Sequence, residues 1–190
     1  MFQFFMQFIR HPKTIGAIAP SGKALAEKMM VPVCFSRAKC IVEYGPGTGS
    51  FTRELIRRKQ PGTKLLVIEK NPVFYQKLKK EFDGEPDVYL IQGDAADVNH
   101  YLSQAGFAAA DYIISGLPFT SLPKTVSENI LLATQKAIGA KGRFITFQYS
   151  LAKQKFFMEY FTMTGRLLEF KNLPPAYVLV MKAAEILQGQ

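Results

Sequence analysis

The fold of this chain is decided by the stretch Glu43-Tyr44-Gly45-Pro46-Gly47-Thr48-Gly49. It begins within an apolar run, residues 40–44, that is typical of a buried strand, and it precedes a predicted helix at 50–59. Glycine permits the tight turn between the two and lets a ligand approach the backbone closely. The free N–H groups and the positive dipole end of the helix favour a dinucleotide or S-adenosylmethionine as that ligand.

The spacing of the glycines separates these two ligands. A dinucleotide fingerprint is G-x-G-x-x-G. Counted from Gly45 its third glycine falls on Ser50, and counted from Gly47 it falls on Thr52, so both registers fail. The observed pattern is an acidic residue followed by x-G-x-G-x-G, the form typical of methyltransferases that bind S-adenosylmethionine. The alternative is a tight strand–helix turn without a ligand.

Length and composition limit the possible classes of protein. The 190 residues are 48% hydrophobic and 21% charged, which suits one domain over residues 1–190. The net charge of +9 favours an anionic partner, such as a nucleic acid, an anionic membrane surface or an acidic metabolite, although many proteins are simply basic. Cys34 and Cys40 form no C-x-x-C pair or Cys/His cluster, so we expect no metal site and a reducing, cytoplasmic setting. No apolar run reaches the ~20 residues of a transmembrane helix.

Strand and helix signals alternate from residue 40 onward. Strands are predicted at 40–44, 64–69, 88–92, 111–115 and 143–148, and helices at 50–59, 72–82, 123–137 and 152–161. Two apolar runs at 166–170 and 177–181 suggest a final antiparallel pair. The pattern predicts an α/β, Rossmann-like fold of the class I methyltransferase type, with a mostly parallel seven-stranded sheet and helices on both faces. Residues 40–190 form this core, preceded by helices at 2–9 and 21–30.

Polar residues follow the second and third predicted strands, where the ligand edge of such a sheet lies. Glu69 comes 20 residues after Gly49, and a carboxylate there accepts hydrogen bonds from both ribose hydroxyls. Lys70 is assigned to the same site. Asp94, within Gly93-Asp94-Ala95, can accept a hydrogen bond from an adenine amino group beside small neighbours. The alternatives are a solvated strand-end Glu69 and an Asp94 that caps a helix, and both roles of Asp94 can hold through different atoms.

The segment Ser115-Gly116-Leu117-Pro118-Phe119 follows the fourth predicted strand, where such folds place the methyl acceptor. Gly116 and Pro118 constrain a backbone that can present carbonyl groups to an incoming amine. Phe119 is expected to stack on a cation or a base. A purely structural turn is the alternative.

Several segments resemble the bacterial phospholipid N-methyltransferases, a family similar in turn to the ribosomal RNA adenine dimethylases. The resemblance spans nearly the whole chain. The matching segments are Arg10-His11-Pro12-Lys13-Thr14-Ile15-Gly16-Ala17-Ile18-Ala19-Pro20-Ser21, Val42-Glu43-Tyr44-Gly45-Pro46-Gly47-Thr48-Gly49, Gly93-Asp94-Ala95, Ser115-Gly116-Leu117-Pro118 and Phe147-Gln148-Tyr149.

This resemblance implies methyl transfer from S-adenosylmethionine to the amine of phosphatidylethanolamine. It implies that residues 1–39 cover the cofactor site, with 15–21 closing it. It also implies that an amphipathic helix at 2–9 makes a peripheral contact with an anionic membrane, on the inner face. The residues themselves show a dense aromatic cluster of Phe2, Phe4, Phe5 and Phe8, for which packing on the core or in a dimer is equally compatible. Tyr149 lies where a substrate-side aromatic residue is expected.

RNA is the main competing acceptor. Adenine N6-methylases carry Asn-x-Pro-aromatic after the fourth strand, and the Asn side chain orients the target amine. Aligned on Leu117-Pro118-Phe119, the Asn position holds Gly116, and little chain remains after residue 185 for the added domain that base-flipping enzymes use. An adenine N6-methylase, a small-molecule methyltransferase and a non-catalytic S-adenosylmethionine-binding protein remain alternatives.

Methyl transfer depends largely on holding the donor and the acceptor in line, so catalysis is compatible with the lack of an identified general base. The predicted residues can be stated together. The catalytic set is Tyr149, Gly116, Leu117 and Pro118; the cofactor-binding set is Ile18, Ser21, Glu43, Gly45, Gly47, Gly49, Glu69, Lys70, Gly93, Asp94, Ala95 and Ser115; no metal ligand is predicted.

Overall fold

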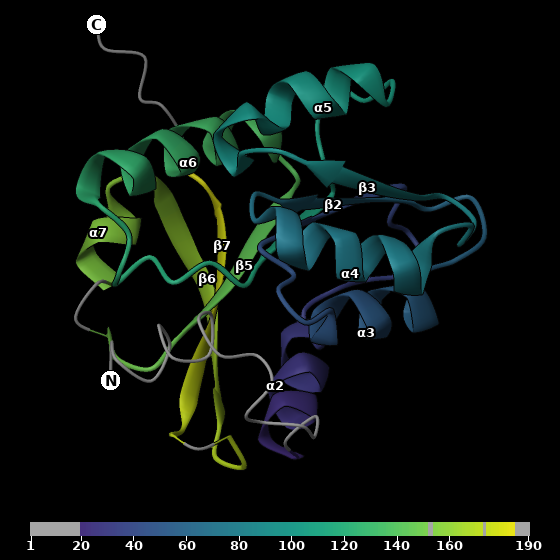
Figure 1. Ribbon diagram of the computed structural model, residues 1–190. Helices are drawn as coiled ribbons and strands as arrows, with labels where there is room; N and C mark the ends of the chain where they lie inside the picture. Colours follow the sequence, from purple (N-terminus) through teal and green to yellow (C-terminus); the bar gives the residue numbers. More distant parts are fainter. Residues whose placement is uncertain (1–19, 152–153, 173, 185–190) are drawn as a thin grey trace, which may run out of the picture.

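A computed structural model describes residues 20–151, 154–172 and 174–184 of the chain (Figure 1). Within them, one mixed sheet has the strand order β3-β2-β1-β4-β5-β7-β6. Strands β1 to β5 run parallel, whereas β7 is antiparallel to both β5 and β6. The bounds are β1 Cys40–Tyr44, β2 Lys64–Glu69, β3 Val88–Gln92, β4 Tyr112–Ser115, β5 Arg143–Gln148, β6 Phe161–Glu169 and β7 Ala176–Ala183. The predicted seven-stranded, mostly parallel sheet is confirmed over the described residues.

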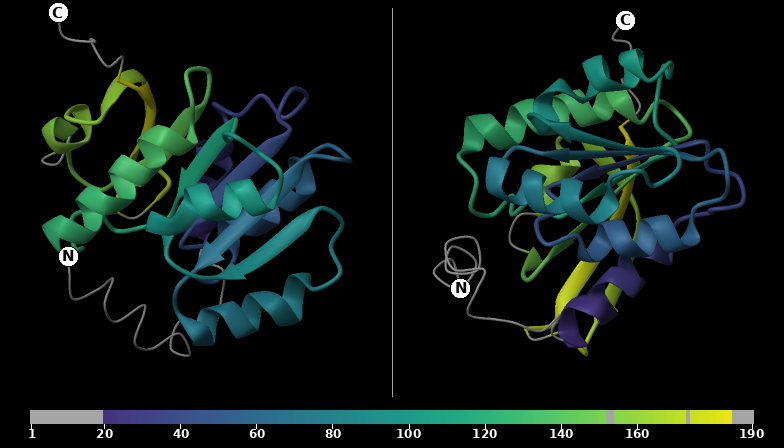
Figure 2. Two further views of the ribbon diagram at one scale, coloured as in Figure 1. Left: turned by 90° about the horizontal axis from the view of Figure 1, so that it is seen from above. Right: turned by 45° about the vertical axis from the view of Figure 1, so that its right-hand side comes forward.

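Helices cover both faces of this sheet. One face carries α2 (Pro20–Met30), α3 (Ser50–Arg58) and α4 (Pro72–Phe82). The other carries the 3-10 helix η1 (Ala95–Asp97), α5 (Val98–Gln104), α6 (Lys124–Ala137) and α7 (Gln154–Met158). The right-hand view of Figure 2 shows the sheet edge-on between the purple and blue helices below and the teal and green helices above. This is the Rossmann-like arrangement that the alternating pattern predicts.

Two apolar layers follow from the apolar runs in the parallel strands. All five residues of β1 are buried, because helices pack on both faces of the central strand. Val42 and Tyr44 point into the layer beneath α5 and α6, and Ile41 points into the layer beneath α2 and α3. Helix α4 begins as its sequence predicts: the Asn71 side chain accepts from the backbone N–H of Val73 at 2.8 Å, and proline occupies the first turn.

The sequence prediction is wrong in two places on this framework. The helix expected at 152–161 is confined to Gln154–Met158 among the described residues, and Phe161 begins β6. Phe161 pairs with Ala183 and its ring lies 5.2 Å from the ring of Phe144, so tertiary contacts override the local helical pattern. Helix α5 was not predicted, although Val98 and Leu102 are spaced four residues apart and are both buried.

The helix predicted at 2–9 lies outside the described residues, whereas the one predicted at 21–30 is confirmed as α2. Among the helices that are described, none combines the length and the apolar character needed to cross a membrane.

The loops after β1, β2, β3 and β4 leave the sheet at one edge, the carboxyl edge. Backbone bonds hold them together there: Gly45 N–H donates to the Ile68 carbonyl at 3.0 Å, and Gly116 N–H donates to the Tyr44 carbonyl at 2.8 Å. Gly93 N–H donates in the same way to the Glu69 carbonyl at 3.1 Å. Parallel pairing therefore gathers the four polar segments into one place.

Candidate cofactor and acceptor site

The loop after β1 needs glycine for two reasons. Gly45, Gly47 and Gly49 have φ of 59°, 56° and 81°, in the left-handed region that other residues rarely adopt. In addition, a Cβ at Gly45 would lie 2.6 Å from Cδ2 of Leu117, and one at Gly49 would lie 3.1 Å from Cε2 of Phe82. A Cβ at Gly47 would meet no atom within 4 Å, so this part of the loop borders open space that a ligand can occupy.

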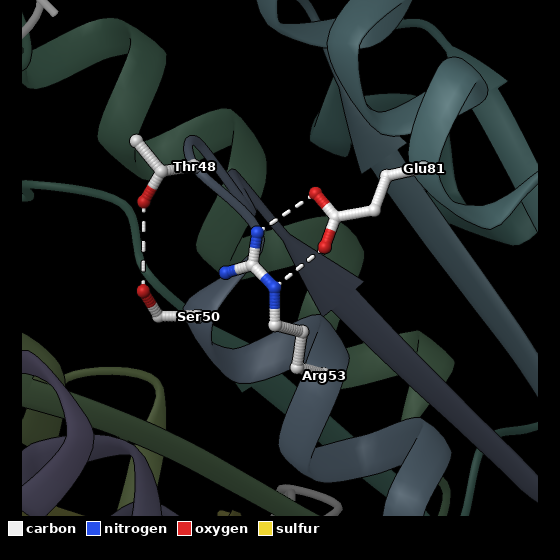
Figure 3. Close-up of polar contacts among 4 residues, drawn as sticks. All are labelled: Thr48, Ser50, Arg53 and Glu81. Atoms are coloured by element: carbon white, nitrogen blue, oxygen red, sulfur yellow. Dashed lines mark hydrogen bonds and ion pairs between the residues drawn. The ribbon is translucent and has the colours of Figure 1, made fainter. Parts of the chain in front are cut away.

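The start of α3, directly after the loop, is tied to α4 by a bidentate ion pair (Figure 3). Arg53 Nε lies 2.6 Å from one oxygen of Glu81, and its Nη2 lies 2.7 Å from the other. The guanidinium also lies 5.9 Å from the centre of the Phe82 ring, which packs against Gly49. The Thr48 and Ser50 hydroxyls are 3.5 Å apart in the same turn. These contacts hold the loop from outside the sheet.

Glu69 at the end of β2 faces the glycine loop. Its Oε2 accepts from Gly47 N–H at 3.2 Å and its Oε1 accepts from Asn71 N–H at 2.7 Å. Burial raises the pKa of Glu69, and the hydrogen bonds from Asn71 and Gly47 oppose that rise. Each carboxylate oxygen has further lone pairs, so it can also accept from hydroxyl groups of a ligand. Glu69 thus lies beside the glycine loop, as its spacing from Gly49 in the sequence predicts.

Glu43, which begins the motif, lies beneath the loop and is completely buried. Among the described residues, no group meets either of its carboxylate oxygens with hydrogen-bond geometry, and the Thr52 hydroxyl is likewise unsatisfied. Burial raises the pKa of Glu43 to about 8; the adjacent Thr52 opposes this shift and the charge of Glu69 adds to it. Glu43 therefore supports the loop from below in its neutral form at neutral pH.

Asp94 after β3 is a helix cap and an ion-pair partner at once. Its Oδ1 accepts from Ala96 N–H at 3.0 Å and caps η1, and its Oδ2 accepts from Lys70 Nζ at 2.7 Å. Although partial burial acts against it, these two bonds hold the pKa of Asp94 below its usual value. The capping role weighed from the sequence is confirmed, and the Lys70 partner is a finding of the structure.

Tyr101 on α5 is a site-side residue that sequence reasoning missed. A Cβ at Gly93 would overlap its hydroxyl, so the aromatic side chain lies directly against the segment Gly93-Asp94-Ala95. The separation of the two residues in sequence and the unpredicted helix α5 concealed this contact. Of the earliest predicted site residues, Ile18 and the side chain of Ser21 lie outside the described part of the chain.

The loop after β4 touches the glycine loop. Ser115 is buried, and its Oγ accepts from Leu117 N–H at 3.2 Å. A Cβ at Gly116 would lie 2.7 Å from the Gly45 carbonyl oxygen, which is closer than real Cβ atoms approach an atom. Over the described residues, no backbone N–H donates to the Gly116 carbonyl, whereas Pro118 accepts from Ser121 N–H at 2.8 Å. Over the described residues the loop thus offers an unoccupied backbone acceptor at Gly116, and its polar side chains after Ser115 are Thr120 and Ser121.

The two aromatic residues near this loop have different environments. Phe119 is fully buried, with its ring 5.4 Å from that of Phe157 and 6.2 Å from that of Phe144. The expectation that Phe119 stacks on a cation or base is therefore wrong, because α7 and β5 supply an apolar pocket for it. Tyr149, directly after β5, is 37% exposed, and its ring lies 5.5 Å from that of Phe147 in β5. Burial raises its pKa and a hydrogen bond with Asn172 opposes this, so the phenol stays protonated at neutral pH.

The described residues contain no group of three or more His, Cys, Asp or Glu residues that could hold a metal ion. The geometry is instead that of a cofactor loop, two carboxylates beside it, and a backbone-lined loop in contact with it.

Comparisons with known proteins give this geometry a context. The model of the ribosomal RNA adenine dimethylase family matches residues 2–158. An ornithine lipid N-methyltransferase of Singulisphaera acidiphila is 30% identical over 177 residues, 92% of each chain. A ribosomal RNA small subunit methyltransferase A of Phenylobacterium zucineum is 32% identical over 79 residues, 42% of this chain and 26% of that one.

Solved structures share the fold at low sequence identity. The N-methyltransferase NodS from Bradyrhizobium japonicum, in complex with S-adenosyl-L-homocysteine, has a TM-score of 0.74 at 12% identity and covers 95% of this chain and 98% of its own. A TehB-like S-adenosylmethionine-dependent methyltransferase from Corynebacterium glutamicum has a TM-score of 0.60 at 18% identity, over 96% and 98% of the two chains. The predicted class I methyltransferase fold is confirmed.

Proposed function

The chain belongs to the ribosomal RNA adenine dimethylase family of S-adenosylmethionine-dependent methyltransferases, and from this premise we propose that its methyl acceptor is the amine of a membrane lipid. The coverage of the relatives supports a lipid acceptor. The lipid N-methyltransferase of Singulisphaera acidiphila matches over 92% of both chains, whereas this chain spans only about a quarter of the Phenylobacterium zucineum ribosomal RNA enzyme.

The single observation that carries the proposal is the contact between Gly116 and Gly45. Adenine N6-methylases orient the target base with an Asn side chain at the position that Gly116 occupies here. In this structure a side chain at that position meets the carbonyl oxygen of Gly45, so the loop has no room for one. The acceptor amine is instead held by backbone groups, and over the described residues no backbone N–H occupies the Gly116 carbonyl. One carbonyl acceptor is enough to hold a primary amine, whereas recognition of an adenine edge requires both a hydrogen-bond donor and an acceptor.

We assign the donor side to the predicted residues. Glu69 accepts the ribose hydroxyls with the lone pairs that Gly47 and Asn71 leave free, and Asp94 accepts the adenine amino group beside Gly93 and Ala95. Residues 1–39, with Ile18 and Ser21, complete the cover of this site within a single domain of residues 1–190. When bound, S-adenosylmethionine supplies an electrophilic methyl group.

The acceptor side works by positioning. The Gly116 carbonyl accepts one N–H of the neutral amine and directs its lone pair toward the methyl group, while Leu117 and Pro118 hold that carbonyl in place. The nitrogen–methyl bond forms as the methyl–sulfur bond breaks, and the methylated amine then releases a proton to water. Tyr149 lines the acceptor side as a protonated phenol, which can donate a hydrogen bond to a headgroup oxygen.

The test is a labelling experiment with the full chain. The protein is incubated with methyl-labelled S-adenosylmethionine and, in parallel, with dispersed ornithine lipid, dispersed phosphatidylethanolamine or small-subunit ribosomal RNA. We expect label in a lipid and none in RNA. Label in RNA alone would overturn the proposal, and label in neither would favour a soluble acceptor. Glu69→Ala serves as the control without donor binding, and Glu85→Ala, at an exposed carboxylate outside the site, serves as its matched control.

A further inference from the structure

The turn between β6 and β7 carries the most solvent-exposed large apolar side chain among the described residues. Phe170 is 74% exposed, and Lys171 beside it is also exposed. An aromatic ring in this position costs solvation free energy unless something covers it. The turn is therefore a candidate interaction surface, and its place in the fold decides which partner fits.

The strand register puts this turn at the carboxyl edge of the sheet. Gln148, the last residue of β5, pairs with Tyr177, and Glu169 pairs with Ala176 on the far side of the turn. The turn thus emerges beside the end of β5, on the same edge as the loop after β4. Figure 1 shows it projecting at the bottom of the molecule, next to α2 and away from α5 and α6.

Lys171 and Asn172 of the turn each donate a hydrogen bond there, and Asn172 links the turn to Tyr149. Lys171 N–H donates to Oε1 of Glu169 at 2.8 Å, and the Asn172 side chain donates to the Pro174 carbonyl at 2.7 Å. Asn172 is only 4% exposed and also hydrogen bonds with Tyr149.

The charges around Phe170 are mainly positive. Glu169 is buried and lies 3.5 Å from Lys28 of α2, so its charge is balanced within the protein. Lys171 and Arg166 are exposed, and the Arg166 guanidinium lies 5.9 Å from the Tyr177 ring. A protruding aromatic ring with flanking cations suits the boundary between headgroups and acyl chains of an anionic bilayer.

We propose that the β6–β7 turn, with the exposed Phe170 as its first residue, docks the enzyme on an anionic lipid bilayer. Phe170 enters the interface, Lys171 and Arg166 pair with lipid phosphates, and the carboxyl edge then faces the surface from which the acceptor comes. A bilayer fits better than a protein partner, because one ring and a few cations are far less than the roughly 800 Å² that each side of a stable protein interface buries. This inference rests on the lipid acceptor proposed above.

The chain contains no tryptophan, so one substitution provides a local probe. Phe170→Trp is mixed with vesicles of phosphatidylglycerol and phosphatidylcholine at low salt. We expect its emission to shift to shorter wavelength and to be quenched by brominated acyl chains. Leu132→Trp, at an exposed position of α6 on the opposite side of the sheet, is the matched control and stays unchanged. An unshifted Trp at position 170 overturns the proposal, whether or not the vesicles bind the protein elsewhere.

A second variant separates docking from catalysis. In Phe170→Asp, the vesicle-bound fraction at limiting lipid falls about ten-fold, as the loss of one buried aromatic ring implies. Methylation of a short-chain lipid amine dispersed in detergent stays at the level of the unaltered protein. Loss of that activity as well would overturn docking, because Phe170 would then act in the site. Docking with no methylation of any lipid by the unaltered protein would instead contradict the proposed acceptor and leave the docking surface standing.

Discussion

The loop after β1 and the loop after β4 touch at Gly45 and Gly116, yet they are built in opposite ways. The first has carboxyl side chains arranged around it, with Glu69 bonded to its backbone and Glu43 buried beneath it. The second offers mainly backbone groups, and its neighbouring aromatic Phe119 is turned into the core. Side chains leave a signal in a sequence, whereas free carbonyl groups do not. This is why the donor is predictable from the residues and the acceptor is not.

The largest expected effect concerns the carboxylate beneath the first loop. Glu43 has a pKa of about 8 in the folded protein, above its value of about 4.3 in the unfolded chain. Between these values the folded state holds a proton that the unfolded state has released, so stability falls as pH rises from about 4.3 to 8 and levels off above that. Glu43→Gln removes this dependence and raises the free energy of unfolding at pH 8 by on the order of 5 kcal/mol.

Urea unfolding at a series of pH values measures this effect. Glu85→Gln, at an exposed carboxylate, is the control and keeps the slope of the unaltered protein. An equal slope in Glu43→Gln would show that Glu43 is ionised in the fold, and the first loop would then have a charged support.

The next effect concerns the side-chain partner of the first loop. Glu69→Gln replaces one acceptor oxygen by an NH₂ group. This donor then faces the backbone N–H of either Gly47 or Asn71, and that hydrogen bond is lost. We expect cofactor affinity to fall roughly thirty-fold, about 2 kcal/mol, with little change in the KM for the acceptor. Isothermal titration with S-adenosylmethionine measures it. Unchanged affinity would mean that Glu69 acts on the loop alone and does not touch the ribose.

A smaller effect is expected where the two loops meet. Gly116→Ala places a Cβ 2.7 Å from the Gly45 carbonyl oxygen, and such overpacking against backbone costs about 1.5 kcal/mol of folding free energy. Gly22→Ala on α2 is the matched control, because a Cβ there meets no atom within 4 Å and alanine favours a helix. Thermal unfolding compares the two. Equal stability of Gly116→Ala and the unaltered protein would remove the steric argument against an Asn at this position.

The smallest effect concerns the outer support of the first loop. Arg53→Gln breaks the bidentate pair with Glu81, which is partly exposed on both sides, and costs about 0.5 kcal/mol. The loss shrinks at high salt because exposed charges are screened. Denaturant unfolding in low and high salt checks this, with Lys124→Gln, which removes an exposed pair remote from the loop, as control. A salt-independent loss would show that packing of Arg53 on Phe82 matters more than its charge.

Much of the fold was predictable because local and tertiary preferences agree there. The bounds of β1, β2, β3 and β5 match the apolar runs of the sequence. Strands β1, β2 and β5 are largely buried between helices and need nearly continuous apolar sequence, whereas β3 lies at the edge of the sheet and is only partly buried. Agreement fails where partners distant in sequence decide. Phe161 joins β6 because it pairs with Ala183 and packs against the Phe144 ring, although the residues before it favour a helix. The unpredicted α5 brings Tyr101 against Gly93 for the same reason.

The sequence by itself determined the donor half of this protein: the strand-to-helix turn at Gly45, Gly47 and Gly49, the carboxylates at Glu69 and Asp94, and the sheet that aligns them. Periodicity and spacing carry these features, because they depend on neighbours a few residues away or on a repeating strand–helix unit. Only the tertiary structure decided that Gly116 meets Gly45, that Phe119 is buried, and that the β6–β7 turn lies at the carboxyl edge of the sheet. Those features depend on how separate strands are registered against one another, and no local stretch of sequence contains that information.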